Sequence, residues 1–406
     1  MTLPTDSTWT PDDIERLLAP VVSELPRPTS LSDLAFDLNA GVPDRATLPA
    51  DALAEAARRA LDADPAGALT YGGTLGYEPL RAWIAAQQSA ETGLPLDASH
   101  VTLTAGSAHA IDNIAATFIA PGDVVIVGAP TYPGAIRTFR ARGARLIEVP
   151  QDDDGLQMVS LASALEHQRA IGAPAKLVYV IANYDNPSGS TLPLHRREEL
   201  AQLAARYHTL VVEDDAYTGI DLDGPPPTSL FAVAGGRGIL RVGTFSKTIA
   251  TGLRVGWVVA DPLIIERLAF MRFDNGASPL MLRTVHEYLE AGTHEEHVGQ
   301  LRALYRERRD ASAQALVEHC EPYVSFRKPS GGFFHWLHLR DGLDALAVTK
   351  AAAAHGVAIT PGSGYYASSG GRDRVRLVYS ALPPQQLDEA ISLLGRALGD
   401  VASARS

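Results

Sequence analysis

Cysteine is nearly absent from this chain of 406 residues, which contains a single one, Cys320. One cysteine excludes an internal disulfide framework and a cysteine-rich metal cluster, so we expect Cys320 to be a small buried hydrophobic residue. Blocks of lysine or arginine are also missing, and 47 acidic against 35 basic residues give a formal charge of -12. This balance provides no long-range attraction to nucleic acid or to an anionic membrane, and we expect a small-molecule ligand instead.

Long apolar runs are missing as well. No segment reaches the length of a membrane span, and the first twenty residues lack the basic start and apolar run of a secretory leader. We therefore expect a cytoplasmic protein. The motifs GxSxG, GxxxxGK and GxGxxG after a strand are absent, which removes the simplest hydrolase, nucleotide and dinucleotide interpretations. His294 and His297 are three residues apart rather than the four of the HExxH zinc motif, so no metal site is predicted.

The residues that are present predict an α/β fold. Hydrophobic residues make up 46% and charged residues 20%, which is typical of a globular protein. Seven short runs rich in β-branched residues alternate with helical stretches, and this pattern predicts a mainly parallel seven-stranded sheet covered by helices on both faces. The runs are 101–106, 123–130, 145–150, 176–183, 209–217, 239–247 and 256–260.

The length of the chain and its changes in composition suggest two domains and an arm. Residues 1–45 are rich in proline, aspartate and threonine and are predicted to form an arm, with one short helix at 11–18, that belongs to the smaller domain. Residues 46–297 are predicted to form the large ligand-binding domain and 298–406 the small α+β domain. One long helix over 280–317 is expected to connect them.

The segment TFSKTIATGLRVGW, residues 244–257, carries the strongest chemical signal. Taken alone, a lysine at the end of a strand is a solvated loop charge. Here the hydroxyls of Thr244 and Ser246 precede Lys247, and Arg254 follows it, which places an amine nucleophile beside groups that bind anions. Because lysine forms Schiff bases with aldehydes, and a phosphate binds hydroxyls and a guanidinium, this pattern favours a phosphorylated aldehyde.

A second signal is the run VVEDDAY, in which a strand leads into two carboxylates and a tyrosine. An acidic strand end that caps a helix is the ordinary interpretation. Asp214 and Tyr217 are three residues apart, so one turn of helix directs both toward one ligand. Asp215 is the weaker candidate, since it is only two residues from the tyrosine.

These two motifs are part of a series of seven that resembles the class I/II aminotransferases, the fold type I enzymes of pyridoxal phosphate (PLP). The other five are TYGGTLGY, TAGSAHA, APTYPG, NYDNPSG and RVRLVYS, and they occur in the order and spacing of that family. Taken alone, each of these motifs is explained equally well by an ordinary turn, helix cap, hairpin or strand. Together they cover roughly residues 35–400, and chance does not produce such a series.

The resemblance implies a role for each matching residue. Lys247 holds PLP as a Schiff base, Asp214 pairs with the pyridine nitrogen, Tyr217 and Asn186 bind the ring oxygen, and Tyr132 stacks on the ring. Arg376 binds the substrate carboxylate beside Asn186 and the backbone of Gly41. The phosphate is bound by the helix start after Gly106 and by the following residues: Ser107, Ala108, Thr244, Ser246, Arg254 and, from the neighbouring subunit of a homodimer with shared active sites, Tyr71.

The implied activity is transamination between an amino acid and a 2-oxo acid through Schiff base and quinonoid intermediates. The same first steps serve β- or γ-elimination and cyclisation of a substrate such as S-adenosylmethionine, so a lyase or cyclase of specialised biosynthesis remains the alternative. Departures from the family pattern at Ala182, Asp185 and Thr251 make such a role plausible. An effector-binding domain of a transcription regulator is disfavoured, because the acidic arm contains no helix-turn-helix or basic patch.

Overall fold

The computed structural model describes residues 9–19, 21–24 and 33–404. Its centre is a sheet with the strand order β2-β9-β8-β7-β6-β3-β4-β5. The five strands β8, β7, β6, β3 and β4 are parallel, whereas β9, β2 and β5 pair in the antiparallel sense. The strand bounds are β2 Val101–Thr104, β3 Val124–Ala129, β4 Arg145–Asp152, β5 Gly155–Leu156, β6 Ala175–Val180, β7 Leu210–Asp214, β8 Ile239–Thr244 and β9 Gly256–Val259.

Alternate residues of the central strands enter two separate hydrophobic cores. On β3, Val124 and Ile126 face one core, while Val125 and Val127 face the other. This alternation follows from the two-residue period of a strand, and it shows that both faces of the sheet are buried. The first face is covered by α5 Glu78–Thr92, α8 Met158–Ala170, α9 Leu194–Tyr207 and α12 Pro279–Glu290, and the second by α6 Ser107–Phe118, α7 Pro133–Ala141 and α11 Pro262–Phe270.

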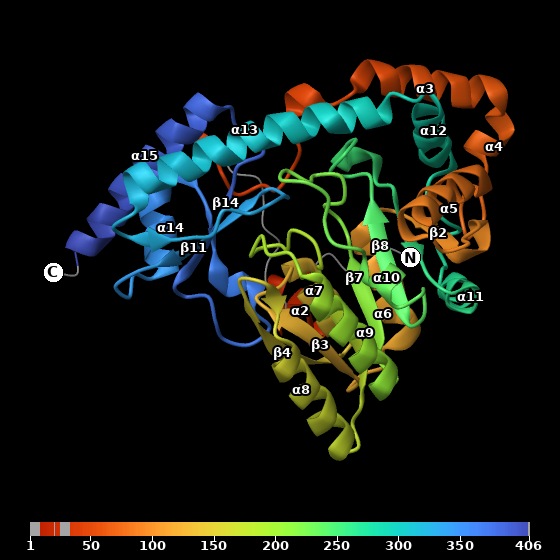
Figure 1. Cartoon of the computed structure of the whole chain (residues 1–406), viewed down its shortest axis with the longest axis horizontal. Helices are drawn as coiled ribbons and strands as arrows, with labels where there is room; N and C mark the ends of the chain where they lie inside the picture. The colour runs from red at the N-terminus through yellow and green to blue at the C-terminus, as the bar shows by residue number, and fades with distance from the viewer. Residues whose placement is uncertain (1–8, 20, 25–32, 405–406) are drawn as a thin grey trace.

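A smaller four-stranded antiparallel sheet, in the order β10-β11-β14-β13, has a core of its own. Its strands are β10 Val324–Ser325, β11 Phe334–Leu339, β13 Thr360–Pro361 and β14 Arg374–Val378, with the helices α13 His294–Cys320, α14 Ala345–Ala354 and α15 Pro384–Ser403. In Figure 1 the long helix α13 crosses the top of the molecule, from α12 to this smaller sheet. Cys320, at the end of α13, is buried as expected.

The described end of the arm joins this second core. Strand β1 Phe36–Asp37 pairs in parallel with β12 Val357–Ala358, and Leu38 is buried among the residues of the small core. The other helices are α1 Pro11–Leu17, α2 Val21–Glu24, α3 Ala50–Ala63, α4 Pro65–Leu69 and α10 Leu230–Val233. The domain boundaries expected after residues 45 and 297 stay predictions. Among the described residues, no helix is both long and apolar enough to cross a membrane.

Two local expectations differ from the structure. The single helix expected over 280–317 is wrong: α12 ends at Glu290 and α13 begins at His294. Gly292 lies between them with φ +76°, a left-handed conformation that a helix cannot contain and that glycine adopts at little cost. The seven expected strands are all present, and the two-residue strand β5 adds an eighth at the edge, because the chain turns back on β4 at residues 152–155.

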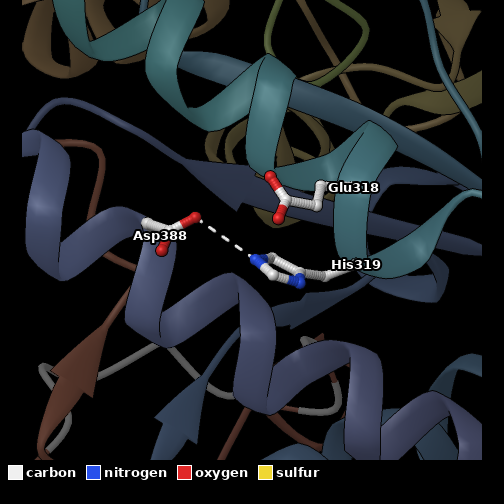
Figure 2. A group of neighbouring side chains, drawn as sticks. All are labelled: Glu318, His319 and Asp388. Carbon is white, nitrogen blue, oxygen red and sulfur yellow. Dashed lines mark hydrogen bonds and ion pairs between the residues drawn. The ribbon is translucent and has the colours of Figure 1, made fainter.

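A group of three polar side chains joins α13 to α15 (Figure 2). The ligand-type atoms of Glu318, His319 and Asp388 all lie within 4.8 Å of one another, and the imidazole of His319 points to Asp388 with an Nε2–Oδ1 distance of 3.2 Å. Both carboxylates are exposed to water. We interpret the group as a surface ion pair, with a second acid beside it, that holds the last helix against α13.

Candidate active site

The predicted site residues come from the carboxyl ends of neighbouring parallel strands. Asp214 is the last residue of β7, Lys247 follows β8, and Asn186 follows β6. These strands are adjacent in the sheet, so their ends meet at one edge, which is where ligands bind in open α/β sheets. The arm also reaches this edge, because Lys247 Nζ donates a hydrogen bond to the carbonyl oxygen of Gly41 over 2.8 Å.

The amine of Lys247 lies in a cationic and aromatic environment. Its Nζ is 5.8 Å from the ring centre of Tyr217 and 6.0 Å from that of Phe333. Burial lowers the pKa of Lys247 from 10.5 to about 8, and the positive charges of Arg376 and Arg254 act in the same direction. A substantial fraction of this amine is therefore neutral near pH 7 to 8, the form that can act as a nucleophile or a base.

One oxygen of the Asp214 carboxylate has no partner. Oδ2 accepts a hydrogen bond from the hydroxyl of Tyr179 over 2.6 Å, whereas Oδ1 is buried and has none in the part of the chain that the structure describes. Burial raises the pKa of Asp214 to about 6, against the lowering effect of the Tyr179 hydrogen bond. A buried acceptor without a partner is costly unless a ligand supplies the donor. Asp215 forms an ion pair with Arg241 instead, so it is not the free carboxylate.

Arg376, on β14 of the smaller sheet, brings a guanidinium to the same place. It donates to Asn186 Oδ1 over 2.9 Å and to the carbonyl oxygen of Asn39 over 2.6 Å, and its Nε has no partner among the described residues. The rings of Phe334 and Tyr365 lie 4.5 and 5.3 Å from its guanidinium carbon. Two neutral acceptors and two aromatic rings fix this fork without neutralising its charge, as the binding of a carboxylate requires.

An anion cradle lies at the start of α6. Gly106 precedes the helix with φ +85°, and the first N–H groups of a helix, here those of Ser107 and Ala108, have no partner within it. At the end of β8, which β9 separates from β2 in the sheet, the hydroxyls of Thr244 and Ser246 are 2.8 Å apart. The cradle is tight, because a Cβ at Gly256 would lie 2.8 Å from the Ser107 nitrogen.

Arg254 and Tyr132 complete this side of the site. Arg254 has φ +52° and donates to the carbonyl oxygen of Ala105 over 3.1 Å, so its guanidinium lies against the cradle. Tyr132 immediately precedes α7 and is partly buried. Burial raises the pKa of Tyr132, and the charge of Asp214 raises it further, which means that the phenol is neutral and close to this carboxylate.

Tyr71 is the predicted residue that the structure places elsewhere. Its side chain is 86% exposed, in the segment between α4 and α5, and no contact connects it to the residues above within the described chain. Leu69 and Phe273 are also exposed, to 67% and 85%. An exposed tyrosine is what a residue that serves a neighbouring subunit requires, and its role in a shared site stays a prediction.

Four contributions escaped sequence reasoning. They are the hydroxyl of Tyr179, the carbonyl oxygen of Asn39 and the rings of Phe334 and Tyr365. Tyr179 stands in a strand at the position of an ordinary core residue, and a backbone carbonyl has no sequence signature at all. Phe334 stands inside GGFFHW, where two adjacent aromatic residues after two glycines gave the only signal.

Together these features form a site suited to a phosphorylated pyridine aldehyde: a partly neutral amine, an unpartnered carboxylate oxygen, an anion cradle and a guanidinium that no acid neutralises among the described residues. Comparison with known proteins agrees. The family model described as aminotransferase class I and II matches residues 35–394 of this chain.

The chain belongs to the class I and II aminotransferases. It is a fold type I, PLP-dependent aminotransferase, as its sequence predicted.

Three proteins similar to this aminotransferase match over nearly their whole length. Aromatic-amino-acid aminotransferase 1 of Thermococcus litoralis is 32% identical over 379 residues, which cover 93% of this chain and 91% of that protein. A kynurenine aminotransferase of Pyrococcus horikoshii, solved in complex with PMP, superposes with a TM-score of 0.89 at 31% identity, covering 96% of this chain and 98% of the other. An α-aminoadipate aminotransferase of Thermus thermophilus, complexed with N-(5'-phosphopyridoxyl)-L-leucine, gives a TM-score of 0.86 at 32% identity, covering 96% and 97%.

Lys247 is the lysine predicted to capture PLP in the apoenzyme of this aminotransferase, and its lowered pKa predicts how the rate of capture depends on pH. The neutral amine attacks an aldehyde, so the attachment rate is expected to rise roughly tenfold per pH unit well below pH 8 and to level off above it. Stopped-flow absorbance of PLP added to apoenzyme measures this rate, and the same aldehyde with a free lysine derivative corrects for its own titration. A corrected rate that keeps rising to pH 10 would contradict the prediction.

Asp185 is one of the residues that differ from the family pattern, and its burial predicts that the stability of the protein depends on pH. It is buried, Oδ2 accepts from the Ser188 hydroxyl over 2.6 Å, and Oδ1 has no partner among the described residues. Burial raises the pKa of Asp185 from 3.8 to about 7. Since the folded state holds this proton more tightly than the unfolded state, the contribution of Asp185 to stability is full below pH 4 and is lost as the pH rises through 7.

The variant Asp185→Asn keeps an acceptor for Ser188 and cannot ionise. Its free energy of unfolding, relative to the unmodified protein, is expected to increase by up to about 4 kcal/mol between pH 4 and pH 8, from a shift of roughly three pKa units. Urea unfolding of both proteins across this range measures the difference. The exposed Asp153→Asn is the control for loss of a carboxylate, and a difference that does not depend on pH would show that Asp185 is not held protonated.

Proposed function

We propose that this aminotransferase transfers the amino group of an α-amino acid to a 2-oxo acid at the site formed by Lys247, Asp214 and Arg376. The single observation that carries the proposal is the convergence of three complementary groups: a partly neutral amine, an unpartnered buried carboxylate oxygen and an arginine without an acid partner among the described residues. Each is unfavourable in a closed protein interior, and each is satisfied by one part of PLP or of an amino acid.

When bound, PLP supplies an aldehyde that accepts an amino group and a ring that withdraws electrons from the substrate Cα. The residues proposed to hold it divide by chemistry. Asp214 Oδ1 accepts from the ring nitrogen, Tyr217 and Asn186 donate to the ring oxygen, and Tyr132 lies on the ring face. The groups proposed for the phosphate are the N–H groups of Ser107 and Ala108, the hydroxyls of Thr244 and Ser246, and the guanidinium of Arg254.

Lys247 is proposed to carry the cofactor at rest and to move the Cα proton once the substrate amine has replaced it. A base works best when its pKa is near the working pH, and a pKa of about 8 meets this condition. Its bond to the Gly41 carbonyl oxygen supports the proposal, because that contact already directs Nζ toward the arm that borders the substrate position.

Arg376 is proposed to bind the substrate α-carboxylate, with the amide of Asn186 beside it. The existing bond from Arg376 to Asn186 Oδ1 leaves the amide N–H₂ of Asn186 free to donate, so one residue can orient the arginine and contact a ligand. The close approach of Gly41 supports this placement. A Cβ there would lie 2.8 Å from the ring of Phe334, which itself packs on Arg376, so the backbone of the arm lies close to the proposed carboxylate position.

The preferred substrates are proposed to be amino acids with large side chains. The names of three relatives support this, since they refer to aromatic amino acids, kynurenine and α-aminoadipate, whereas another similar structure is an alanine:glyoxylate aminotransferase. We also propose a homodimer in which Tyr71 serves the partner's phosphate site, supported by its exposure, and a cytoplasmic location, as the sequence suggests.

Two measurements test the proposed function. Borohydride reduction of the PLP-loaded enzyme, followed by peptide mass analysis, is expected to fix the pyridoxyl group on the peptide that contains Lys247, with other lysines unlabelled. A screen of amino acids is then expected to give a 2-oxo acid together with pyridoxamine phosphate. Release of ammonia, or of a cyclised product, with PLP regenerated would support the lyase or cyclase alternative, and labelling of another lysine would overturn the site.

A further inference from the structure

The hydroxyl of Tyr179 reaches Asp214 because of the register between two parallel strands. Tyr179 on β6 is the direct neighbour of Val212 on β7, and Asp214 lies two residues further along the same face. Two residues of strand span about 6.6 Å, close to the length of a tyrosine side chain that leans along the strand. The hydroxyl therefore meets Asp214 Oδ2, at 2.6 Å.

The position of this hydroxyl is fixed by packing. Tyr179 is fully buried in the core between the sheet and α6, α7 and α11, and its ring forms an edge contact with Phe139 at 5.9 Å. The phenol has no room to rotate away, and burial and the nearby negative charge of Asp214 raise its pKa well above the usual range, so it is a permanent donor. Asp214 Oδ2 is thereby occupied, and Oδ1 is the oxygen left without a partner among the described residues.

We propose that Tyr179 is a positioning residue of the aminotransferase reaction: it fixes the rotation of the Asp214 carboxylate and keeps it ionised, so that Oδ1 faces the pyridine nitrogen of PLP. This inference rests on the proposed role of Asp214. Burial alone favours the protonated acid, and a hydrogen bond donated to the ionised form opposes burial. The Tyr179 bond has this effect on Asp214.

Other charged and titratable groups face Asp214 and act on its ionisation. Lys247 favours the charged form, whereas the nearby acid Asp215 disfavours it. Asp185, after β6, interacts with Asp214 as a second buried acid. Two further phenols complete the surroundings of the carboxylate, Tyr132 and Tyr217. None of these side chains donates a hydrogen bond to Oδ2 within the described chain. The backbone N–H of Ala216 also favours the ionised form, and the effect of Tyr179 is larger.

The test uses the full-length holoenzyme, reconstituted with PLP that carries ¹⁵N in its ring. The ¹⁵N chemical shift reports whether the ring nitrogen is protonated, which a purely structural role of Tyr179 would not alter. In Tyr179→Phe the Asp214 carboxylate loses a donor and becomes a stronger base, by roughly one to two pKa units for a hydrogen bond to an ionised group. The proton shared by the two groups is therefore expected to move from the ring nitrogen toward Asp214, and the ¹⁵N shift toward that of the unprotonated ring. Tyr288→Phe, which removes a hydroxyl from another buried tyrosine far from this carboxylate in sequence, is the matched control and is expected to leave the ¹⁵N shift unchanged.

Two further samples distinguish a failure of the role proposed for Asp214 from a failure of the inference about Tyr179. Asp214→Asn is expected to abolish ring protonation; if it does not, the proposed role of Asp214 fails. If Asp214→Asn has that effect and Tyr179→Phe gives the ¹⁵N shift of the unmodified enzyme, only the inference about Tyr179 is overturned. Should Tyr179→Phe not fold, 3-fluorotyrosine at position 179 preserves the shape and makes the hydroxyl a stronger donor, so the shared proton is expected to move further toward the ring nitrogen and the ¹⁵N shift toward that of the protonated ring. An unchanged ¹⁵N shift in that sample would contradict the inference equally.

Discussion

Replacement of Lys247 with alanine is expected to lower kcat by about 10⁴-fold or more. The variant loses the covalent anchor of the cofactor and the base proposed to move the Cα proton, and a positioned acid or base alone contributes about 10² to 10⁴. The anion cradle and Asp214 stay in place, so the variant is expected still to bind PLP noncovalently, with its absorbance shifted to that of the free aldehyde. Single-turnover assays with the best substrate from the amino-acid screen measure the loss.

Lys176→Ala removes an exposed lysine that pairs with Asp123 and is the control for loss of a lysine elsewhere in the same sheet.

Addition of a small primary amine to Lys247→Ala is expected to restore part of the rate, because such an amine can enter the space left by the side chain and accept the proton. A Lys247→Ala enzyme within tenfold of the unmodified rate would remove this lysine from the mechanism.

Asp214→Asn is the second substitution with a large expected effect, a fall in kcat of about 10²- to 10³-fold. The amide can still accept from Tyr179, but the group turned to the ring then carries no charge and offers a donor instead of an acceptor. The ring nitrogen accordingly loses its proton and withdraws electrons less well. Pre-steady-state kinetics are expected to show the loss in the proton-transfer step, with the affinity for the substrate carboxylate little changed because Arg376 is intact.

Asp185→Asn provides a matched control for this prediction, because it makes the same chemical change at another buried acid in the same site. Its carboxyl accepts a hydrogen bond from Ser188, and it is not among the residues predicted to bind the cofactor. We expect its kcat to stay within about tenfold of the unmodified enzyme. Equal losses in the two variants would mean that general electrostatics, rather than a specific contact of Asp214, determines the rate.

Short sequence patterns were enough to predict most of the fold and to select the candidate cofactor-binding residues. The seven long strands were predictable because each is a short β-branched run between helical segments, and the positions of Lys247 and Asp214 followed because both stand at strand ends, where the chain emerges from the sheet. The break at Gly292 was missed because a glycine within a helical pattern is compatible with either continuation or termination.

The remaining parts depend on relations between distant segments. The role of Tyr179 comes from the register of β6 against β7, and no run of sequence encodes that register directly. The second acceptor of Arg376 is a backbone carbonyl of Asn39, more than three hundred residues away. The role predicted for Tyr71 came only from a family motif, since a residue predicted to serve another subunit has no partner within its own described chain to support that role.

The unneutralised guanidinium of Arg376 also matters for the handling of this enzyme. Its hydrogen-bond acceptors are an amide and a carbonyl, and it forms no ion pair among the described residues. Any small carboxylate in a storage or assay buffer, such as acetate or citrate, is attracted to that positive charge and is expected to compete with the amino acid proposed to bind there. Apparent Michaelis constants measured in such buffers will therefore overstate the true value, and a zwitterionic sulfonate buffer of low ionic strength is the better medium for comparing substrates.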